Sequence, residues 1–307
     1  MNTSIRTQGL LSVVAAGSLL ASASAFALNP GTPGDGDPNP CETNCGFEVG
    51  PDPTVQSMRA ENGPFSWSTL DVGSGNGFAG GTIYYPEDTN KELAAVAVVP
   101  GFVSPESSIE WWGKQLASHG FVAITIATNT PLDLPSARAS QLNAALDYIL
   151  EQDETSGSAI NGMVDESRLG VVGWSMGGGG ALRVAQEGRI SAAIPLAPWD
   201  TVKDVSDVQV PTMMFVCEDD VIAPNDNHSY VFWDGLPDTI DKGYLEFANE
   251  GHYCANGNNE NNEILSQVGI SWMKRHLDKD QRYTQFLCDT DYTSDETVLD
   301  YRENCPF

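Results

Sequence analysis

Residues 170–180 read GVVGWSMGGGG, and this stretch decides the fold. An apolar run ends at Gly173, as expected of a buried strand that stops there. Ser175 follows almost at once, and beyond it come four glycines and a helix-forming run at 181–187. The stretch therefore predicts a strand, a sharp turn that carries a serine, and a helix.

The pattern around Ser175 is G-x-S-x-G, from Gly173 to Gly177. It is typical of the nucleophile elbow of α/β-hydrolases, in which a strained turn holds a serine at the carboxyl end of a central strand. The chain has 30 glycines, so the pattern alone is weak, because a glycine-rich turn with an incidental serine would read the same way. The flanking strand and helix favour the functional interpretation, and Ser175 is the candidate nucleophile.

The order of the remaining elements predicts an α/β fold with a mostly parallel central sheet, helices on both faces and no separate lid. The continuous apolar run at 94–99 is typical of a buried central strand. Strands are expected near 65–71, 80–85, 94–99, 121–127, 190–196, 212–217 and 244–249, besides the one before Ser175. Helices are expected near 108–118, 136–152, 181–187, 227–235 and 260–277.

The N-terminal region has the features of a secretory signal peptide over residues 1–27. An apolar run at 10–20 is followed by small residues, and it is too short to span a bilayer. We expect cleavage after Ala27 and a soluble, exported protein, with an uncleaved anchor as the alternative. Residues 28–53 are rich in Pro, Gly, Asp and Asn and predict a flexible leader. Residues 54–307 then form one catalytic domain.

The composition also limits the partners. The formal net charge is -27, and such a surface repels nucleic acid and anionic membranes. We therefore expect neither nucleic acid nor a membrane as a partner, and a monomer.

Six cysteines are present, and an even number in an exported chain is typical of disulfides. Proximity in sequence suggests that Cys288 pairs with Cys305. Cys41 and Cys45 lie in the leader, where they could close a small ring, and we assign them no catalytic part.

A serine nucleophile needs a base that accepts its proton, and the chain has only four histidines. His119 is expected to cap a helix, and His276 lies in an amphipathic helix and is expected at the surface. His228 follows the strand that should supply the acid, whereas in this fold the histidine comes from a later loop. His252 follows the predicted strand at 244–249, so we predict that it is the base.

The acid that orients the base should follow a strand between the nucleophile and the base. The strand at 212–217 is followed by Glu218, Asp219 and Asp220, and Asp200 follows the preceding strand. Any of them could instead be a solvated loop charge in this acidic protein. Spacing alone does not separate Asp219 from Asp220.

The developing negative charge needs two backbone N–H groups, the oxyanion hole. Met176, directly after the nucleophile, should supply one of them. The other should come from the loop after the strand at 94–99, where Phe102 is the natural donor and Gly101 permits the bend. This chemistry requires neither a metal nor an organic cofactor.

Six longer stretches carry a more specific signal. They read VVPGFVSPESSIEWWG at 98–113, GWSMGGGG at 173–180, PLAPWD at 195–200, CEDDVIAP at 217–224, GHYCANG at 251–257 and SWMKRHLDKDQRYTQFLC at 271–288. Together they resemble bacterial polyester hydrolases, the cutinase-like enzymes that include poly(ethylene terephthalate) hydrolases. The resemblance extends over residues 54–307.

The resemblance implies a role for each candidate residue. Ser175 would be the nucleophile, His252 the base and Asp220 the acid, with Phe102 and Met176 as the oxyanion donors. It also implies that Cys217 pairs with Cys254. An exposed apolar groove for the substrate is expected to contain Phe102, Trp174, Met176, Trp199, Ile222 and Tyr253.

We therefore expect a secreted serine esterase that hydrolyses small esters and cutin-like, aliphatic or terephthalate polyesters through an acyl-enzyme. The first alternative is a general short-chain carboxylesterase or lipase with the same three residues. A catalytically silent member of the fold, used for adhesion or carbohydrate binding, is the second.

Overall fold

A computed structural model describes residues 46–87, 89–258, 261–288 and 290–307. The predicted signal peptide, the first part of the predicted leader, Cys41 and Cys45 lie outside the described residues. Within these ranges, no helix has both the length and the apolar character needed to cross a membrane.

The described chain is built on a nine-stranded sheet with the order β1-β2-β4-β3-β5-β6-β7-β8-β9. All neighbours from β4 to β8 in this order are parallel, and β2, β1 and β9 extend the sheet by antiparallel pairing. The strands are β1 (Trp67–Val72), β2 (Gly80–Pro86), β3 (Leu93–Val99), β4 (Val122–Ala127), β5 (Val164–Trp174), β6 (Ala192–Leu196), β7 (Thr212–Cys217), β8 (Lys242–Phe247) and β9 (Val298–Glu303).

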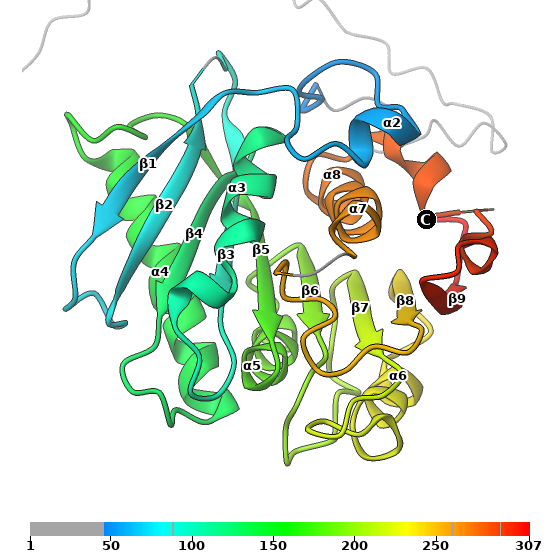
Figure 1. Ribbon diagram of the computed structural model, residues 1–307. Coiled ribbons are helices and arrows are strands. Elements are labelled where there is room, and N and C mark those ends of the chain that lie inside the picture. The colour runs from blue at the N-terminus through cyan, green and yellow to red at the C-terminus, as the bar shows by residue number, and fades with distance from the viewer. Residues whose placement is uncertain (1–45, 88, 259–260, 289) are drawn as a thin grey trace, which may run out of the picture. The chain divides into compact units, whose positions relative to one another are not determined.

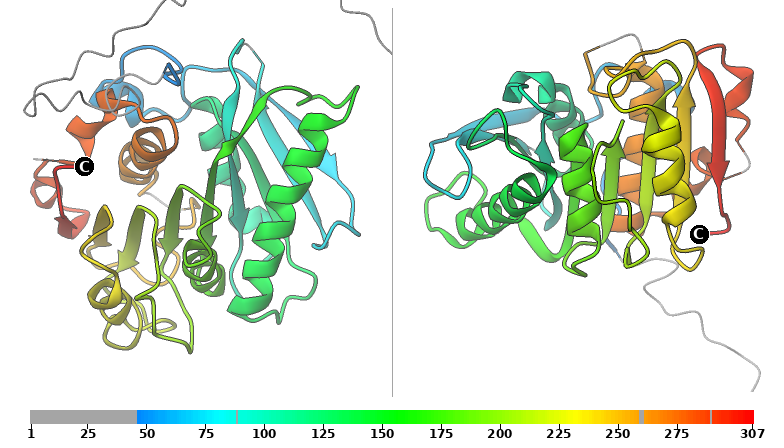
Figure 2. Two further views of the ribbon diagram at one scale, coloured as in Figure 1. Left: turned by 180° about the vertical axis from the view of Figure 1, so that it is seen from behind. Right: turned by 90° about the horizontal axis from the view of Figure 1, so that it is seen from below.

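Helices cover both faces of the sheet (Figures 1 and 2). One face packs against α4 (Pro135–Glu154), α5 (Met176–Ala185) and α6 (Ser229–Gly235). The other packs against α2 (Val55–Met58), α3 (Glu110–Ser118), α7 (Asn262–Leu265) and α8 (Ser271–Leu277). Alternate residues of β3 belong to the two core clusters, which explains its continuous apolar sequence. The predicted α/β fold, a mostly parallel sheet with helices on both faces, is confirmed.

Two elements differ from the expectation. The helix expected at 260–277 contains a π-helical segment, Ser266–Ile270, between α7 and α8. Strand β9 was not among the expected strands, and only Val298 of its six residues is buried. It pairs with the edge of the sheet at β8.

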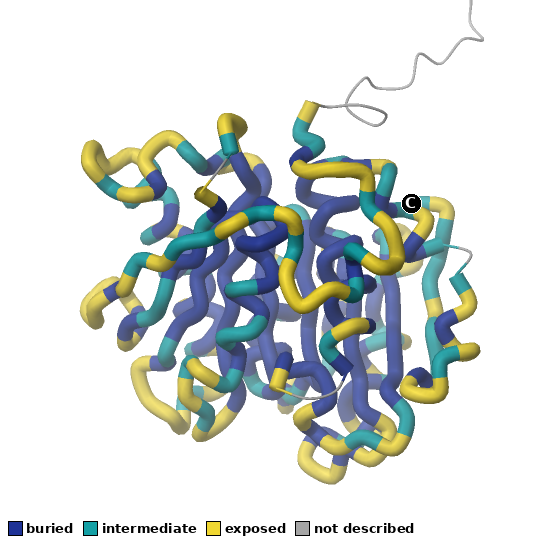
Figure 3. Tube along the Cα trace, turned by 45° about the horizontal axis from the view of Figure 1, so that its top comes forward, coloured by how far each residue is buried: buried dark blue, intermediate teal, exposed yellow. Residues whose placement is uncertain are grey.

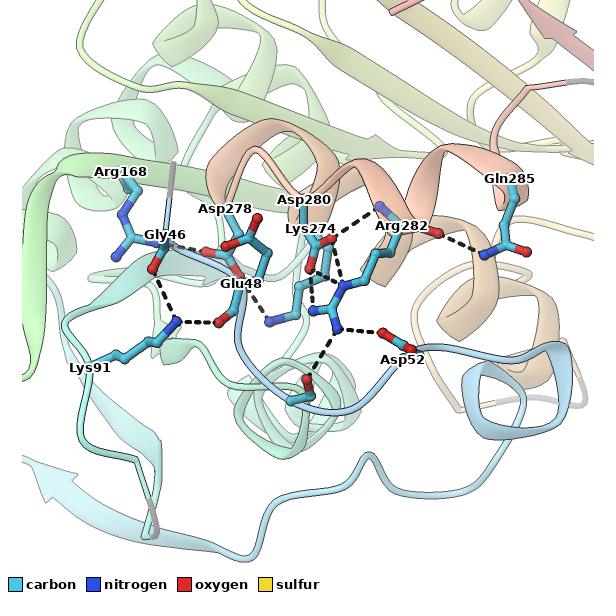
Figure 4. Close-up of polar contacts among 11 residues, drawn as sticks. Gly46, Glu48, Asp52, Lys91, Arg168, Lys274, Asp278, Asp280, Arg282 and Gln285 are labelled. Atoms are coloured by element: carbon cyan, nitrogen blue, oxygen red, sulfur yellow. Dashed lines mark hydrogen bonds and ion pairs between the residues drawn. The ribbon is translucent and has the colours of Figure 1, made fainter. Parts of the chain in front are cut away.

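Residues 46–53, the last part of the predicted leader, pack against the domain. Val49 is buried, and the ring of Phe47 lies 4.3 Å from the guanidinium of Arg168. Lys91 donates hydrogen bonds to the carbonyl oxygens of Gly46 and Glu48 (Figure 4). This segment covers a buried ion-pair cluster in which one carboxylate, Asp278, binds both Arg168 and Lys274.

Strands β3 to β8 are buried along most of their length, and exposed residues gather in the connecting loops (Figure 3). Because the central strands are parallel, the loops that follow β3 to β8 meet at one edge of the sheet. The candidate site lies at this edge.

Candidate active site

Ser175 lies between the end of β5 and the start of α5. Its φ of 59° and ψ of -119° are strained for a residue with a side chain, as expected of a nucleophile elbow. The backbone around it is held on both sides, since its N–H donates to Leu196 O and its own carbonyl oxygen accepts from Gly179 and Trp199. The hydroxyl is thereby fixed above the carboxyl end of a central strand.

The glycines after Ser175 belong to α5, which begins at Met176 and not at the run 181–187. They are required by close packing. A Cβ atom at Gly177 would lie 2.5 Å from Val99 O, and one at Gly179 would lie 2.3 Å from Trp199 O. The start of the helix can therefore approach the end of β3 and the loop after β6 only without side chains.

The structure brings Ser175, His252 and Asp220 together. His252 Nε2 lies 2.7 Å from Ser175 Oγ, and His252 Nδ1 lies 2.6 Å from Asp220 Oδ2. The carboxylate can only accept at Nδ1, so Nδ1 carries the proton and Nε2 is left to accept the proton of the serine hydroxyl. All three residues are buried. This geometry suits nucleophilic attack by a serine assisted by a general base.

Asp220 is held by more than the histidine. Its Oδ1 accepts hydrogen bonds from the backbone N–H groups of Ile222 and Ala223, at 2.9 and 2.7 Å. Burial disfavours the charged carboxylate, but the hydrogen bonds from His252 and this backbone outweigh burial, so the pKa of Asp220 lies below its ordinary value. The group is therefore a carboxylate at neutral pH.

The other candidate acids lie elsewhere. Asp219 is exposed, and Glu218 accepts a hydrogen bond from the N–H of Asn249. Asp200 forms a two-point ion pair with Arg183. The ambiguity among these carboxylates is thus resolved by contact with the imidazole, which only Asp220 makes among the described candidates.

A disulfide joins the loop of the acid to the loop of the base. Cys217, at the end of β7, pairs with Cys254, two residues after His252. The second disulfide joins Cys288 to Cys305 near the C-terminus. Both predicted pairings are confirmed.

Trp174 does not line an open groove. Only 2% of its surface is exposed, and its indole N–H donates to the carbonyl oxygen of His252 at 2.9 Å. Its ring packs against those of His252 and Tyr253. The expectation of an exposed Trp174 is wrong, because the residue before the nucleophile points under the loop of the base. Phe102, Ile222 and Tyr253 are exposed as expected, and Trp199 and Met176 are partly exposed.

Trp199 stacks on His228, with ring centroids 5.6 Å apart. His228 Nδ1 lies 2.6 Å from the ammonium of Lys203, and burial together with this charge lowers the pKa of His228 to about 4. The imidazole is therefore neutral and accepts a hydrogen bond from the lysine. No sequence pattern indicated that His228 stacks on Trp199 and accepts a hydrogen bond from Lys203.

The two remaining histidines are buried away from Ser175. His119 is the C-cap residue of α3, as expected. His276 is only 2% exposed and packs against Trp272 and Phe307, so its expected surface position is wrong. Neighbouring Lys274 and Arg275 are buried with it, and their charges had suggested a solvated helix.

The two predicted oxyanion donors belong to segments that lie next to Ser175. Met176 is the first residue of α5, where backbone N–H groups have no partner within the helix. Phe102 lies in the turn after β3, and an added Cβ at Gly101 would be 2.9 Å from Ser175 Cβ. The turn thus passes directly beside the nucleophile. In the described ranges, no group of three or more His, Cys, Asp or Glu side chains is arranged to hold a metal ion.

The serine lies at the turn between a parallel strand and a helix, and hydrogen bonds connect it to a histidine and, through the histidine, to a carboxylate. This arrangement defines the serine hydrolases with an α/β-hydrolase fold. The chain belongs to the PET hydrolase-like family, whose sequence model matches residues 41–306. The resemblance expected from the motifs is confirmed.

Individual relatives agree with the family. The chain is 46% identical over 267 residues to a cutinase of Thermobifida alba, and the match covers 85% of this chain and 87% of the relative. It is 46% identical over 266 residues to cutinase 2 of Thermobifida cellulosilytica, covering 85% and 98%. It is 45% identical over 264 residues to a bis(hydroxyethyl) terephthalate hydrolase of Streptomyces coelicolor, covering 85% and 82%.

Proposed function

We propose that this protein is a secreted serine esterase that hydrolyses the ester bonds of polyesters, and of small esters related to them, through an acyl-enzyme. The observation that carries the proposal is the continuous hydrogen-bonded path from Ser175 Oγ through His252 to Asp220, over 2.7 and 2.6 Å. Relatives named as cutinases and as a bis(hydroxyethyl) terephthalate hydrolase support the choice of substrate.

In the proposed mechanism, His252 Nε2 takes the proton of Ser175 as Oγ attacks the ester carbonyl carbon. Asp220 holds the imidazole and stabilises its charged form, while the N–H groups of Phe102 and Met176 bind the negative oxygen. His252 then gives the proton to the leaving alcohol. Water, activated by the same imidazole, attacks the acyl-enzyme and releases the acid.

The distribution of apolar side chains supports a polymeric substrate. Eleven large apolar side chains of the described residues are exposed, and eight of them lie in segments that follow the carboxyl ends of the parallel strands, the edge of the sheet that carries Ser175. These eight are Phe102, Val103, Leu132, Leu134, Val202, Val221, Ile222 and Tyr253. Exposed apolar residues gathered in one region are typical of a binding surface. A short soluble ester would not need so wide a surface, whereas an apolar polymer would contact it.

A panel of substrates tests the proposal. The purified protein should release product from 4-nitrophenyl butyrate, bis(hydroxyethyl) terephthalate and an aliphatic polyester film, and Ser175→Ala should abolish all three activities. An alkyl phosphonate should add its mass to Ser175 in the wild type. Activity confined to the butyrate would favour the short-chain carboxylesterase, and an unlabelled serine would favour a catalytically silent protein.

Export and oligomeric state belong to the same proposal. We expect the protein in the culture medium as a monomer whose N-terminus is Leu28. N-terminal sequencing and light scattering measure both. An intact Met1 on the secreted protein would contradict the cleavage, and a dimer mass would contradict the monomer.

A further inference from the structure

Arg138, in the first turns of α4, has a buried guanidinium that binds backbone. The residue is 0% exposed, and it takes part in none of the ion pairs found among the described residues, although the charge of Asp133 acts on it. Instead it donates to three carbonyl oxygens, from Nε to Asp133 at 2.9 Å, from NH1 to Pro100 at 2.9 Å and from NH2 to Pro131 at 3.3 Å. Burial lowers its pKa to about 10, which leaves it charged at neutral pH.

Two of these carbonyl groups fix the 100–103 turn, which follows β3 and carries Phe102. Pro100 O is bound directly by Arg138. Pro131 O, also bound by Arg138, accepts a second hydrogen bond from the N–H of Val103 at 2.8 Å. Phe102 therefore lies between two residues that are both tied to one guanidinium, directly or through Pro131.

The turn is strained and has little packing of its own. Val103 has a φ of 55°, which is rare for a β-branched residue, and it is 58% exposed. Phe102 is 45% exposed. A strained conformation persists only where the surrounding structure imposes it, and neither side chain is buried enough to do so. Ser104 closes the turn locally, with its N–H donating to Gly101 O at 3.3 Å and its Oγ to Phe102 O at 3.1 Å. The hydrogen bonds to Arg138 and Pro131 connect the turn to the rest of the domain.

We propose that Arg138 is a positioning residue for the oxyanion hole, which holds the 100–103 turn so that the N–H of Phe102 points at the developing oxyanion. This inference rests on the proposed function, because it gives Phe102 a part in catalysis. Arg138 itself touches no reacting atom. Three carbonyl groups in three directions require a planar guanidinium, which a single ammonium group cannot replace.

The test is Arg138→Lys, with Arg168→Lys as a matched control. Arg168 is also buried, and it binds the carbonyl oxygen of Glu92, just before β3, whereas Arg138 binds that of Pro100, just after β3. Each variant loses a buried guanidinium at one end of the same strand. We expect both to melt at lower temperature, and only Arg138→Lys to change the chemistry.

For 4-nitrophenyl butyrate, we expect kcat of folded Arg138→Lys to fall about 10- to 100-fold with KM nearly unchanged, since full loss of an oxyanion donor costs about 100- to 1,000-fold. Inhibition by a trifluoromethyl ketone, whose adduct with the serine bears an oxyanion, should weaken by a similar factor. Equal melting losses in both variants with kcat and inhibition unchanged would overturn the inference.

If Arg138→Lys does not fold, Val103→Pro tests the same turn at an exposed position, with Val103→Ala as its control. Proline removes the N–H that binds Pro131 and cannot adopt positive φ. We expect kcat to fall in Val103→Pro only, and an unchanged kcat in that variant would refute the inference. The Ser175→Ala result is independent of these outcomes, since an active Ser175→Ala would reject the proposed function itself.

Discussion

The indole N–H of Trp174 donates a hydrogen bond to the carbonyl oxygen of His252, so the residue before the nucleophile holds the backbone of the base. Ser175 and His252 are 77 residues apart in the chain. They are linked by the hydrogen bond between their own side chains and also by this one, from the residue before Ser175 to the backbone of His252. We therefore expect substitutions at residues adjacent to the reacting groups to affect both stability and rate.

Trp174→Phe should keep a ring under the loop of the base and lose this hydrogen bond. We expect the free energy of unfolding to fall by about 1–2 kcal/mol and kcat to fall about tenfold, because the imidazole is less precisely placed. Urea unfolding and ester hydrolysis measure the two effects.

Trp112→Phe is the matched control, because the buried Trp112 donates to Ala255 O in the same loop. It should lose comparable stability and keep most of kcat. Equal rate losses in both variants would mean that any loosening of the loop has the same effect.

Asp220→Asn should fold and lose about 10,000-fold in kcat, because an amide permits the wrong tautomer of His252. The exposed neighbour Asp219 provides the control, and Asp219→Asn should retain wild-type kcat. Steady-state kinetics with a circular dichroism spectrum for each variant checks this. A large loss of kcat in Asp219→Asn would instead mean that Asp219, and not Asp220, is the acid.

Acid should destabilise the protein through its buried histidines. Burial lowers the pKa of His119 from 6.5 to about 4, while in the unfolded chain the group titrates near 6.5. The unfolded state therefore binds a proton first as pH falls, so stability is complete above pH 6.5 and is lost toward pH 4. The loss is of the order of 3 kcal/mol for this one group.

His119→Asn should reduce that slope, since it does not titrate and can still donate to Gln115 O, which His119 Nδ1 binds at 2.8 Å. Urea unfolding between pH 4.5 and 7.5 measures the effect. If the free energy of unfolding depends on pH in the same way in the variant and the wild type, His119 binds its proton as readily in the folded state as in the unfolded state.

Removal of the Cys217–Cys254 disulfide should affect both stability and rate. The bonded residues are 37 positions apart, and those of Cys288–Cys305 are 17 apart, which corresponds to about 4 and about 3 kcal/mol of chain entropy. We expect Cys217→Ala with Cys254→Ala to lower kcat as well, because the acid and base loops are no longer joined. Cys288→Ala with Cys305→Ala should lower the melting temperature and leave kcat unchanged. Equal losses of activity in the two double variants would contradict a specific effect of the disulfide that joins the acid and base loops.

The sequence predicted the parts of the site that depend on side-chain type and order along the chain. Ser175 was identified by its glycines and its flanking elements, and His252 by its loop after a late strand. Asp220 could not be separated from Asp219 by spacing, because neighbouring loop residues differ only in direction, which the tertiary structure sets.

The contacts that the sequence did not indicate involve backbone acceptors. Arg138 binds three carbonyl groups and Trp174 binds one, and a carbonyl group is present at every residue, so no pattern of letters marks it. The predicted surface position of His276 was wrong for a related reason, since buried ion pairs and ring contacts allow the charged stretch around it to face the core.

The packing of residues 46–53 bears on how the protein should be produced. A recombinant version that starts at residue 54 would remove the ring over Arg168 and the acceptors of Lys91, and would open the buried ion pairs of Asp278 to water. A cloning boundary placed ahead of Gly46 keeps that cover in place.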